Sequence, residues 1–451
     1  MPMTMPKMLA ATLLAALLAT AAPAWSAETA TANDTAHFLA GLPPASDSPL
    51  AALTKDAAWQ QHAHYFDSIF GREDSNTLSK VRAFSRERLT DKHDTMLYMF
   101  SGPDFLYATS FFPTASTYVL SGLEPVGQVP QLTGLPHGTV DNTLHNLERS
   151  LGTLLSYSFF ITKNMKTQLN EGPVYGTLPV IYVFLARTGK TIHDVTVGGL
   201  DKDGNFQADE TATDDKGKKL VWHAPSAAPG VKIVFSDGNG PHQTLYYFNT
   251  NIADGSIEHS GFLAFCEKLG VADSFVKSAS YLLHTGGFSK VRTLLLNRSA
   301  TILQDDSGIP LAYFDPKKWR LQPFGRYVGP LSIFGNQYQP RMGELFAKGA
   351  IPLDFGIGYR FRKNESNLLL AQKIAAATSD NEELAPSLPD HESVQGPVGQ
   401  PPKKGRSAAK PPHTRKNGAD GDVTGSLGCR IAAIFPFCSD PTPAPRPKPS
   451  R

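Results

Sequence analysis

Two similar strand exits, close together in the sequence, constrain the fold of this chain more than any other feature. The stretch Met96–Gly127 contains two short apolar runs, Met96–Phe100 and Thr117–Leu120. A Ser-Gly pair follows each run, Ser101-Gly102 and then Ser121-Gly122, and an acid and a proline come next. Short apolar runs that end in turn residues are typical of strands. The pattern therefore predicts one edge of an α/β sheet, where ligands commonly bind.

The first residues have the order of a secretory signal peptide. Lys7 precedes an apolar run, Met8–Ala22, and Ala24-Trp25-Ser26-Ala27 follows it as a cleavage region. The run is shorter than the roughly 18–20 residues that a membrane span requires. We therefore expect removal of residues 1–27 and an exported protein, periplasmic or extracellular, without a transmembrane span.

Charge and cysteine content narrow the classes of function. The net charge of +2 on 451 residues gives no electrostatic signal of specific nucleic-acid binding. Cys266 lies on one apolar helical face with its neighbours, which predicts a buried thiol. Cys429 and Cys438 are close in the sequence, and an exported chain can join them in a disulfide.

The composition predicts a single folded domain between two polar segments. Residues 28–56 are expected to be flexible, and residues 57–362 to form one mixed α/β domain with helices on both faces of a parallel or mixed sheet. A β-hairpin insertion is expected over about 199–250, with its turn at Asp237–Gly240. Residues 363–427 are polar, rich in Pro and predicted to be disordered. Residues 428–451 are expected to form a C-terminal tail, which is apolar over Gly428–Cys438.

Hydrophobic periodicity gives the expected elements of that domain. The expected helices span 57–70, 78–89, 144–169, 178–187, 257–269, 288–297 and 337–348, with loose helical turns over 368–377. The expected strands, besides those of the opening stretch, span 191–197, 231–236, 244–249, 276–283, 300–304, 311–314, 320–328 and 353–361.

Polar residues at the predicted strand exits form the candidate site. The carboxyl ends of parallel strands lie at one edge of a sheet, where ligands gather. Carboxylates and a histidine suit acid–base chemistry or a hard cation, and the candidates for a catalytic role are Asp104, Glu124, His284 and Asp305. Glycines and helix N-termini favour close contact with an anion or ligand, and the candidates are Ser101, Gly102, Gly286 and Gly287. Each residue also has an ordinary structural interpretation as a cap, a turn or a core group.

Two familiar motifs are partly present in the middle of the chain. Arg187–Thr191 has the end of a P-loop, but Phe184 stands where that motif needs glycine. Asp201, Asp203 and Glu210 match a calcium loop, although Gly199 occupies the position of its first ligand. A simple hairpin turn is the alternative interpretation. No cofactor follows from either motif.

The polar C-terminal segment suggests an interaction of its own. Six positive residues lie within Lys403–Lys416, and such a stretch can contact an anionic surface. A solvated linker is the alternative.

The motifs resemble those of a group of uncharacterised secreted bacterial proteins. The resemblance rests on Ser101–Ala108, Leu120–Gly127, Leu303–Pro310 and Phe324–Tyr327, and it spans roughly residues 57–362. No activity is known for that group, so the resemblance implies export and no catalytic residue. We expect a ligand-binding or envelope-associated protein. The alternative is a hydrolase-like enzyme at the predicted sheet edge, assisted by a divalent cation.

Overall fold

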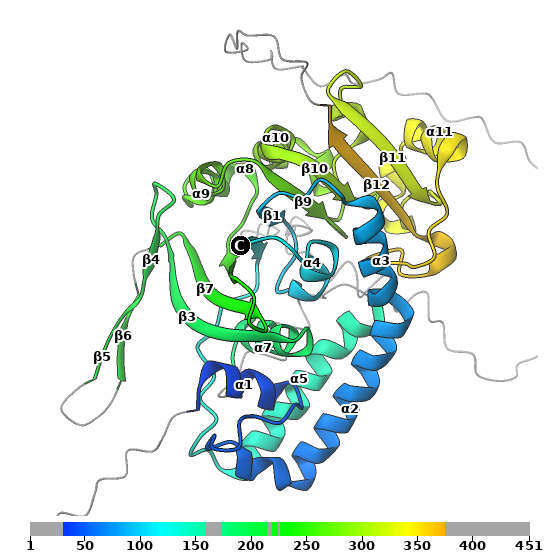
Figure 1. Cartoon of the computed structure of the whole chain (residues 1–451). Coiled ribbons are helices and arrows are strands. Elements are labelled where there is room, and N and C mark those ends of the chain that lie inside the picture. Colours follow the sequence, from blue (N-terminus) through cyan, green and yellow to red (C-terminus); the bar gives the residue numbers. More distant parts are fainter. Residues whose placement is uncertain (1–29, 158–173, 214–218, 224–225, 375–451) are drawn as a thin grey trace, which may run out of the picture.

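The computed structural model describes residues 30–157, 174–213, 219–223 and 226–374, and it contains a ten-stranded mixed sheet with helices on both faces (Figure 1). The α/β fold predicted from the sequence is confirmed. The strands are β1 (Thr95–Tyr98), β2 (Thr117–Gly122), β3 (Lys190–Leu200), β4 (Phe206–Ala208), β7 (Ala228–Asp237), β8 (His242–Asn249), β9 (Ala272–Val276), β10 (Ser299–Gln304), β11 (Trp319–Gly325) and β12 (Asn367–Lys373). A separate hairpin pairs β5 (Glu210–Thr213) with β6 (Lys219–Trp222).

The helices fill the connections between these strands. They are α1 (Ala32–Leu39), α2 (Ala57–Glu73), α3 (Ser79–Arg88), α4 (Phe105–Phe111), α5 (His137–Tyr157), α7 (Leu178–Arg187), α8 (Asp254–Ile257), α9 (Phe262–Lys268), α10 (Ser289–Arg298) and α11 (Pro340–Gly349). A π-helical segment, Asp74–Leu78, joins α2 to α3. None of the described helices combines the length and the apolar character that a membrane crossing needs.

The order of the strands defines a switch point in the sheet. The whole sheet runs β11-β12-β10-β9-β1-β2-β8-β7-β3-β4. Five neighbouring strands from β10 to β8 are parallel, and β12 and β7 flank them in antiparallel orientation. From β1 the chain moves to β2 and then to β3 and β4 at the far edge, comes back through β7 and β8, and continues on the other side of β1 as β9 and β10. The strand order thus reverses between β1 and β9, as in doubly wound nucleotide-binding sheets.

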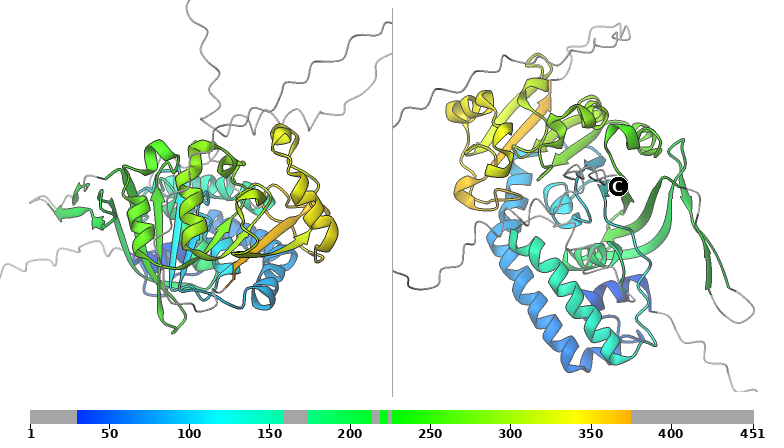
Figure 2. Two further views of the ribbon diagram at one scale, coloured as in Figure 1. Left: turned by 90° about the horizontal axis from the view of Figure 1, so that it is seen from above. Right: turned by 180° about the vertical axis from the view of Figure 1, so that it is seen from behind.

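Alternating side chains of the central strands supply two cores. Met96 and Tyr98 of β1 point into the larger core, which helices α1 to α5 and α7 cover. Leu97 and Met99 point into the other core, which α8, α9 and α10 cover. The view along the sheet shows helices on both of its sides (Figure 2). A strand with two buried faces carries an unbroken apolar run, which explains why β1 is recognisable from the sequence.

The folded domain is longer than predicted at both ends. The segment 28–56, predicted to be flexible, contains α1, whose Phe38 and Leu39 are buried in the larger core. The loose helical turns predicted over 368–377 are wrong, because residues 367–373 form β12 inside the sheet. Leu368 to Ala371 are buried there as an unbroken apolar run.

Some predictions fall on residues outside the described part of the chain. These are the signal peptide within residues 1–29, the end of the helix expected over 144–169, and everything predicted for residues 375–451. The last group includes Cys429, Cys438 and the basic stretch.

Several other elements differ from the predictions. The strand expected over 276–283 ends at Val276, because Asp273 and Ser274 belong to a buried strand that begins earlier. The strands expected over 311–314 and 353–361 are absent from the described chain, and Leu311–Tyr313 is a 3₁₀ turn. Helix α5 begins at His137, seven residues before the start expected at Leu144.

Two predictions are confirmed in detail, and a third is confirmed in part. Helix α7 spans Leu178–Arg187, and Gly189 follows it with φ of +73°. β7 and β8 form the predicted hairpin, although both join the main sheet instead of forming an insertion. Cys266 is a buried thiol, and burial raises its pKa.

Candidate functional site

The Ser101-Gly102 pair that follows β1 is hydrogen-bonded to Ser121, near the end of β2. The amide of Gly102 donates to the Ser121 carbonyl over 3.1 Å. The Ser101 hydroxyl donates to the carbonyl oxygens of Gly102 and Ser121, and it accepts from the Ser121 amide at 3.2 Å. The Ser101 side chain thereby extends the β1–β2 pairing beyond the end of β1. Its polar atoms are used within the protein, so the pairing gives Ser101 and Gly102 a structural role.

Glycine at position 122 is required by this packing. A Cβ atom there would lie 2.5 Å from the Glu124 carboxylate and 2.9 Å from both the Gly102 Cα and the Tyr247 hydroxyl oxygen. A Cβ atom at Gly286 or Gly287, by contrast, would meet no such neighbour within 4 Å. The first amides of α10 behind them already bind the Asp254 carboxylate, at 3.1 Å for Ser289 and 2.9 Å for Lys290. The expected anion contact at this helix is therefore occupied by a protein carboxylate.

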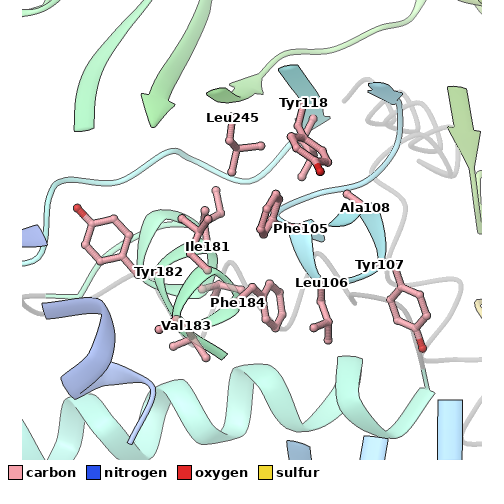
Figure 3. Close-up of a cluster of buried hydrophobic side chains, with 14 of the residues drawn as sticks. Phe105, Leu106, Tyr107, Ala108, Tyr118, Ile181, Tyr182, Val183, Phe184 and Leu245 are labelled. Carbon is pink, nitrogen blue, oxygen red and sulfur yellow. The ribbon is translucent and has the colours of Figure 1, made fainter. Parts of the chain in front are cut away.

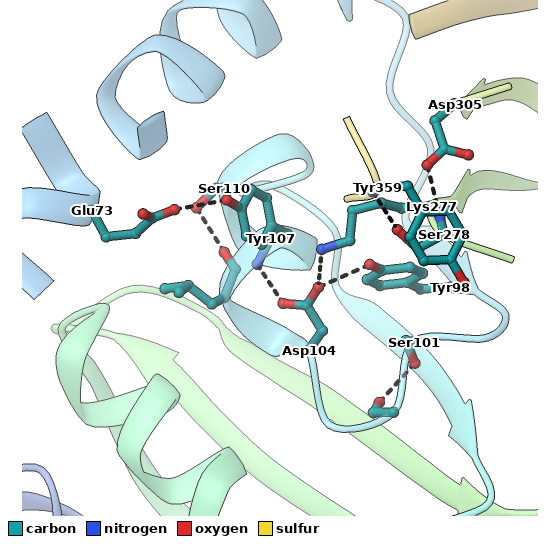
Figure 4. Close-up of polar contacts among 12 residues, drawn as sticks. Glu73, Tyr98, Ser101, Asp104, Tyr107, Ser110, Lys277, Ser278, Asp305 and Tyr359 are labelled. Atoms are coloured by element: carbon teal, nitrogen blue, oxygen red, sulfur yellow. Dashed lines mark hydrogen bonds and ion pairs between the residues drawn. The ribbon is translucent and has the colours of Figure 1, made fainter. Parts of the chain in front are cut away.

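The switch point between β1 and β9 holds a buried ion pair (Figure 4). Lys277, the first residue after β9, places its Nζ 2.7 Å from Oδ2 of Asp104, which follows β1. Both side chains are almost fully buried, at 2% and 1% exposure. Asp104 also accepts from the Tyr98 hydroxyl at 2.9 Å and from the Tyr107 amide at 3.2 Å. It therefore caps α4 and also joins the exits of β1 and β9.

A second buried acid approaches this pair from the helical layer. Glu73, the last residue of α2, accepts a hydrogen bond of 2.7 Å from the Tyr107 hydroxyl. The Lys277 Nζ lies 4.0 Å from the centre of the Tyr107 ring, which makes a cation–π contact. Burial raises the pKa of Glu73. The π-helical segment begins at the next residue, and such segments are frequent at functional sites.

Left-handed backbone is concentrated at the same two strand exits. Among the described residues, four other than glycine have positive φ values: Phe100 at 62°, Ser278 at 54°, Ser280 at 53° and Tyr281 at 57°. Phe100 follows β1, and the other three follow β9. Each such residue costs of order 1–3 kcal/mol, and strain of this kind clusters at ligand sites.

The exit of β10 lies next to this strained loop. Asp305 accepts from the Ser278 amide at 2.7 Å and from both the amide and the hydroxyl of Ser307. Burial, together with the charge of Asp306, raises the pKa of Asp305 to about 6. Asp306 accepts from the Tyr281 hydroxyl at 2.6 Å, and burial raises its pKa as well. Both aspartates thus hold the left-handed loop in place.

The other two catalytic candidates have different partners. Glu124 lies on the β2 side, where the Tyr247 hydroxyl donates to its backbone carbonyl at 2.7 Å. Burial and the charge of Glu124 raise the pKa of Tyr247. The His284 Nδ1 is 3.1 Å from Oε1 of Gln337, and burial lowers the pKa of His284. His284 lies in a 3₁₀ turn, Leu282–His284, beyond the end of β9 at Val276.

An apolar layer supports the ion pair from the side of α4. All residues of α4 are buried, and Figure 3 shows Phe105 between Tyr118 of β2 and the side chains of α7. The Phe105 ring packs edge-on against Tyr118, with centroids 5.2 Å apart. Phe184 of α7 belongs to the same core. This packing holds α4, and with it Asp104, at the end of β1.

The described residues contain no group of three His, Cys, Asp or Glu side chains placed to hold a metal ion. In the suspected calcium loop, Asp201 instead accepts from the amides of Asp203 and Asn205, at 3.0 and 2.8 Å. The hydrogen bonds from Asn205 lower the pKa of Asp201 to about 2. These contacts are those of the alternative interpretation, a hairpin turn.

Two residues at the centre of this site are absent from the sequence-based candidates. Lys277 falls inside the wrongly predicted strand 276–283, and Glu73 lies beyond the predicted helix 57–70. The correct strand boundary places Lys277 at a strand exit. No sequence signal marks the π-helical segment that follows Glu73.

The comparisons with known proteins add no assignment. A scan against protein-family models, a search of curated proteins and a search of solved structures each found no match.

Proposed function

We propose that this is an exported protein that binds a small polar molecule at the switch point of the sheet, between the exits of β1 and β9. The observation that carries the proposal is the buried pair of Asp104 and Lys277 at the switch point of the sheet. Ligands of open α/β sheets bind at that point, outside the carboxyl ends of the strands. Export is supported by the signal-peptide pattern of residues 1–27 and by the resemblance to secreted bacterial proteins.

The contribution of the Asp104–Lys277 pair to the stability of the fold does not explain its presence. Replacing a buried ion pair by apolar residues of similar volume is often neutral or stabilising, since both charges must be removed from water. Four left-handed residues in the same two loops add further cost. Two unfavourable features at one binding position of the fold are better explained by a ligand than by packing.

Charge balance favours a zwitterionic ligand. A ligand with a net charge would leave an uncompensated charge beside this buried ion pair, which is strongly unfavourable. A molecule with one ammonium and one carboxylate group can insert between the two partners, with the carboxylate on Lys277 and the ammonium on Asp104. The insertion leaves no charge without a partner. Free amino acids and similar small zwitterions meet this requirement.

Titration calorimetry with a panel of small molecules tests the proposal. The panel contains the common amino acids, with putrescine as a purely cationic probe and succinate as a purely anionic probe. We expect at least one zwitterion to bind the wild type and to lose binding in the D104N/K277M variant. The D104N change retains an oxygen that can cap α4, and the K277M change retains an unbranched side chain of similar length. Binding that persists in this variant, or a panel without any binding zwitterion, contradicts the proposal.

The hydrolase alternative has less support from the contacts. It needs Asp104, Glu124, His284 and Asp305 to act on one substrate. Asp104 pairs with Lys277, Glu124 faces Tyr247 of β8, and His284 pairs with Gln337. A ligand-binding role needs only the two strand exits that the ion pair joins.

A further inference from the structure

We propose that the amino edge of the sheet carries a second interaction surface, which binds the headgroups of anionic phospholipids. Five cations form this surface, which we call the cationic edge: Arg298, Lys317, Lys318, Arg320 and Lys373. It lies at the opposite end of the strands from the ion pair of Asp104 and Lys277. The inference is independent of the proposed ligand site.

Three chain segments bring the cationic edge together. Arg298 ends α10, Lys317 and Lys318 precede β11, and Lys373 ends β12. The Lys373 Nζ donates to the Asn297 carbonyl at 2.7 Å, and the amide of Ile374 donates to the Lys318 carbonyl at 2.9 Å. β11 and β12 lie next to each other, with α10 beside them (Figure 1). Residues distant in the sequence thus share one surface.

The charges of the cationic edge are exposed and lack acidic partners within the described chain. Lys317, Lys318, Arg320 and Lys373 are exposed, and Arg298 is half-buried. No ion pair of the described residues includes any of the five. The neighbouring Asp315 uses a carboxylate oxygen to accept from the Lys317 amide at 2.9 Å. Burial and the charges of Lys318 and Arg298 lower the pKa of Lys373, which is consistent with cations crowded together.

The position and chemistry of the cationic edge favour a lipid surface over a nucleic acid. The described chain ends at Ile374, beside this edge, and the sequence that follows contains six more positive residues within Lys403–Lys416. Basic clusters of this kind bind anionic lipid with an energy that grows with each lysine or arginine. The aromatic residue at this edge, Trp319, is buried under Lys373 and offers no open ring for stacking bases.

Vesicle sedimentation with the full chain tests the proposal. The probes are phosphatidylcholine vesicles with and without about 30% phosphatidylglycerol, at low salt and at about 0.5 M salt. We expect binding only to the anionic vesicles and its loss at high salt. The variant K317Q/K318Q/R320Q/K373Q should bind at least about tenfold more weakly. The control variant R72Q/K202Q/K348Q/K363Q removes as many exposed charges elsewhere and should bind like the wild type.

Three results would overturn the proposal. The first is a wild type that does not bind anionic vesicles, and the second is equal weakening in both variants. The third is binding to heparin, a soluble polyanion, without binding to vesicles. Should the fourfold variant unfold, K317E/K318E changes only two exposed loop residues and must also weaken vesicle binding. Unchanged binding by K317E/K318E would equally contradict the role of this edge.

Discussion

The two ends of the parallel strands accommodate charge in opposite ways. At the carboxyl edge, Asp104 and Lys277 are buried and bind each other at 2.7 Å. At the amino edge, Lys317, Lys318 and Arg320 are exposed and lack acidic partners within the described chain. A charge removed from water must be paired, whereas a solvated charge needs no partner. A substitution at the carboxyl edge should therefore affect stability, and one at the amino edge should affect only association.

The carboxyl and amino edges of the parallel strands also differ in backbone strain. The exits of β1 and β9 contain the four left-handed residues other than glycine that occur in the described chain. The amino edge of β9 is held by an ordinary contact, in which Asp273 accepts from the amide and the ring of His93 at 2.8 and 3.1 Å. Strained backbone survives only where the surrounding structure fixes it. The hydrogen bonds of Asp305 and Asp306 provide that support at the carboxyl edge.

The largest effect is expected from removing one charge of the buried pair. K277M should lower the free energy of unfolding by about 3–5 kcal/mol, because Asp104 keeps its charge without its cation. Urea unfolding measures this change. The matched substitution at the amino edge, K373M, should change it by less than about 1 kcal/mol. Equal effects at the two edges would remove the contrast between them.

A pH effect should come from the exit of β10. Asp305 has a pKa of about 6 in the folded protein, above its ordinary value near 4. A raised pKa favours folding while the carboxyl is protonated, and that contribution is lost as the pH rises from about 4 through about 6. D305N should remove up to about 3 kcal/mol of the stability change across this window. Urea unfolding at several pH values measures it, and an unchanged pH dependence in D305N would refute it.

Alanine substitutions at two glycines compare a tightly packed position with one that has open space around it. G122A should lower the free energy of unfolding by about 1–3 kcal/mol, because its methyl group would meet the Gly102 Cα and the Tyr247 hydroxyl. G286A has open space around the new methyl group and should stay within about 0.5 kcal/mol of the wild type. Thermal unfolding of the two variants compares them. If G286A lowers the free energy of unfolding as much as G122A does, the loop before α10 is tightly packed, and the expected difference is refuted.

The smallest effect on stability is expected at the cationic edge. K317Q/K318Q should leave the free energy of unfolding within about 0.5 kcal/mol of the wild type, because both side chains are solvated. A stability loss above about 1 kcal/mol in urea unfolding would show that these lysines belong to the fold.

The centre of the sheet is predictable from the sequence. The apolar runs of β1 and β2 and the shared edge of their exits follow from composition and turn residues. The capping role of Asp104 at α4 is one of the structural interpretations that its position allows. The Ser-Gly pairs are also recognisable, but their mutual hydrogen bonds depend on the close approach of two loops, which a local pattern does not contain.

The rest of the site depends on tertiary contacts. β9 carries Asp273 and Ser274, whose polar groups are satisfied by His93 and Ser299, so a buried strand has a polar sequence. The predicted strand is therefore displaced toward His284, and Lys277 is not recognisable as an exit residue. The prediction of helical turns over 368–377 is wrong because the strand there depends on tertiary pairing. β12 pairs with β10 and β11, which lie far earlier in the chain.

The double variant D104N/K277M gives the most direct test of the claim that the ion pair serves a ligand and not the fold. Its free energy of unfolding, measured in urea beside the wild type and K277M, is the deciding quantity. We predict that it lies within about 1 kcal/mol of the wild type, because neither buried charge remains. A double variant as unstable as K277M would show that the pair is a structural element, and it would contradict the account.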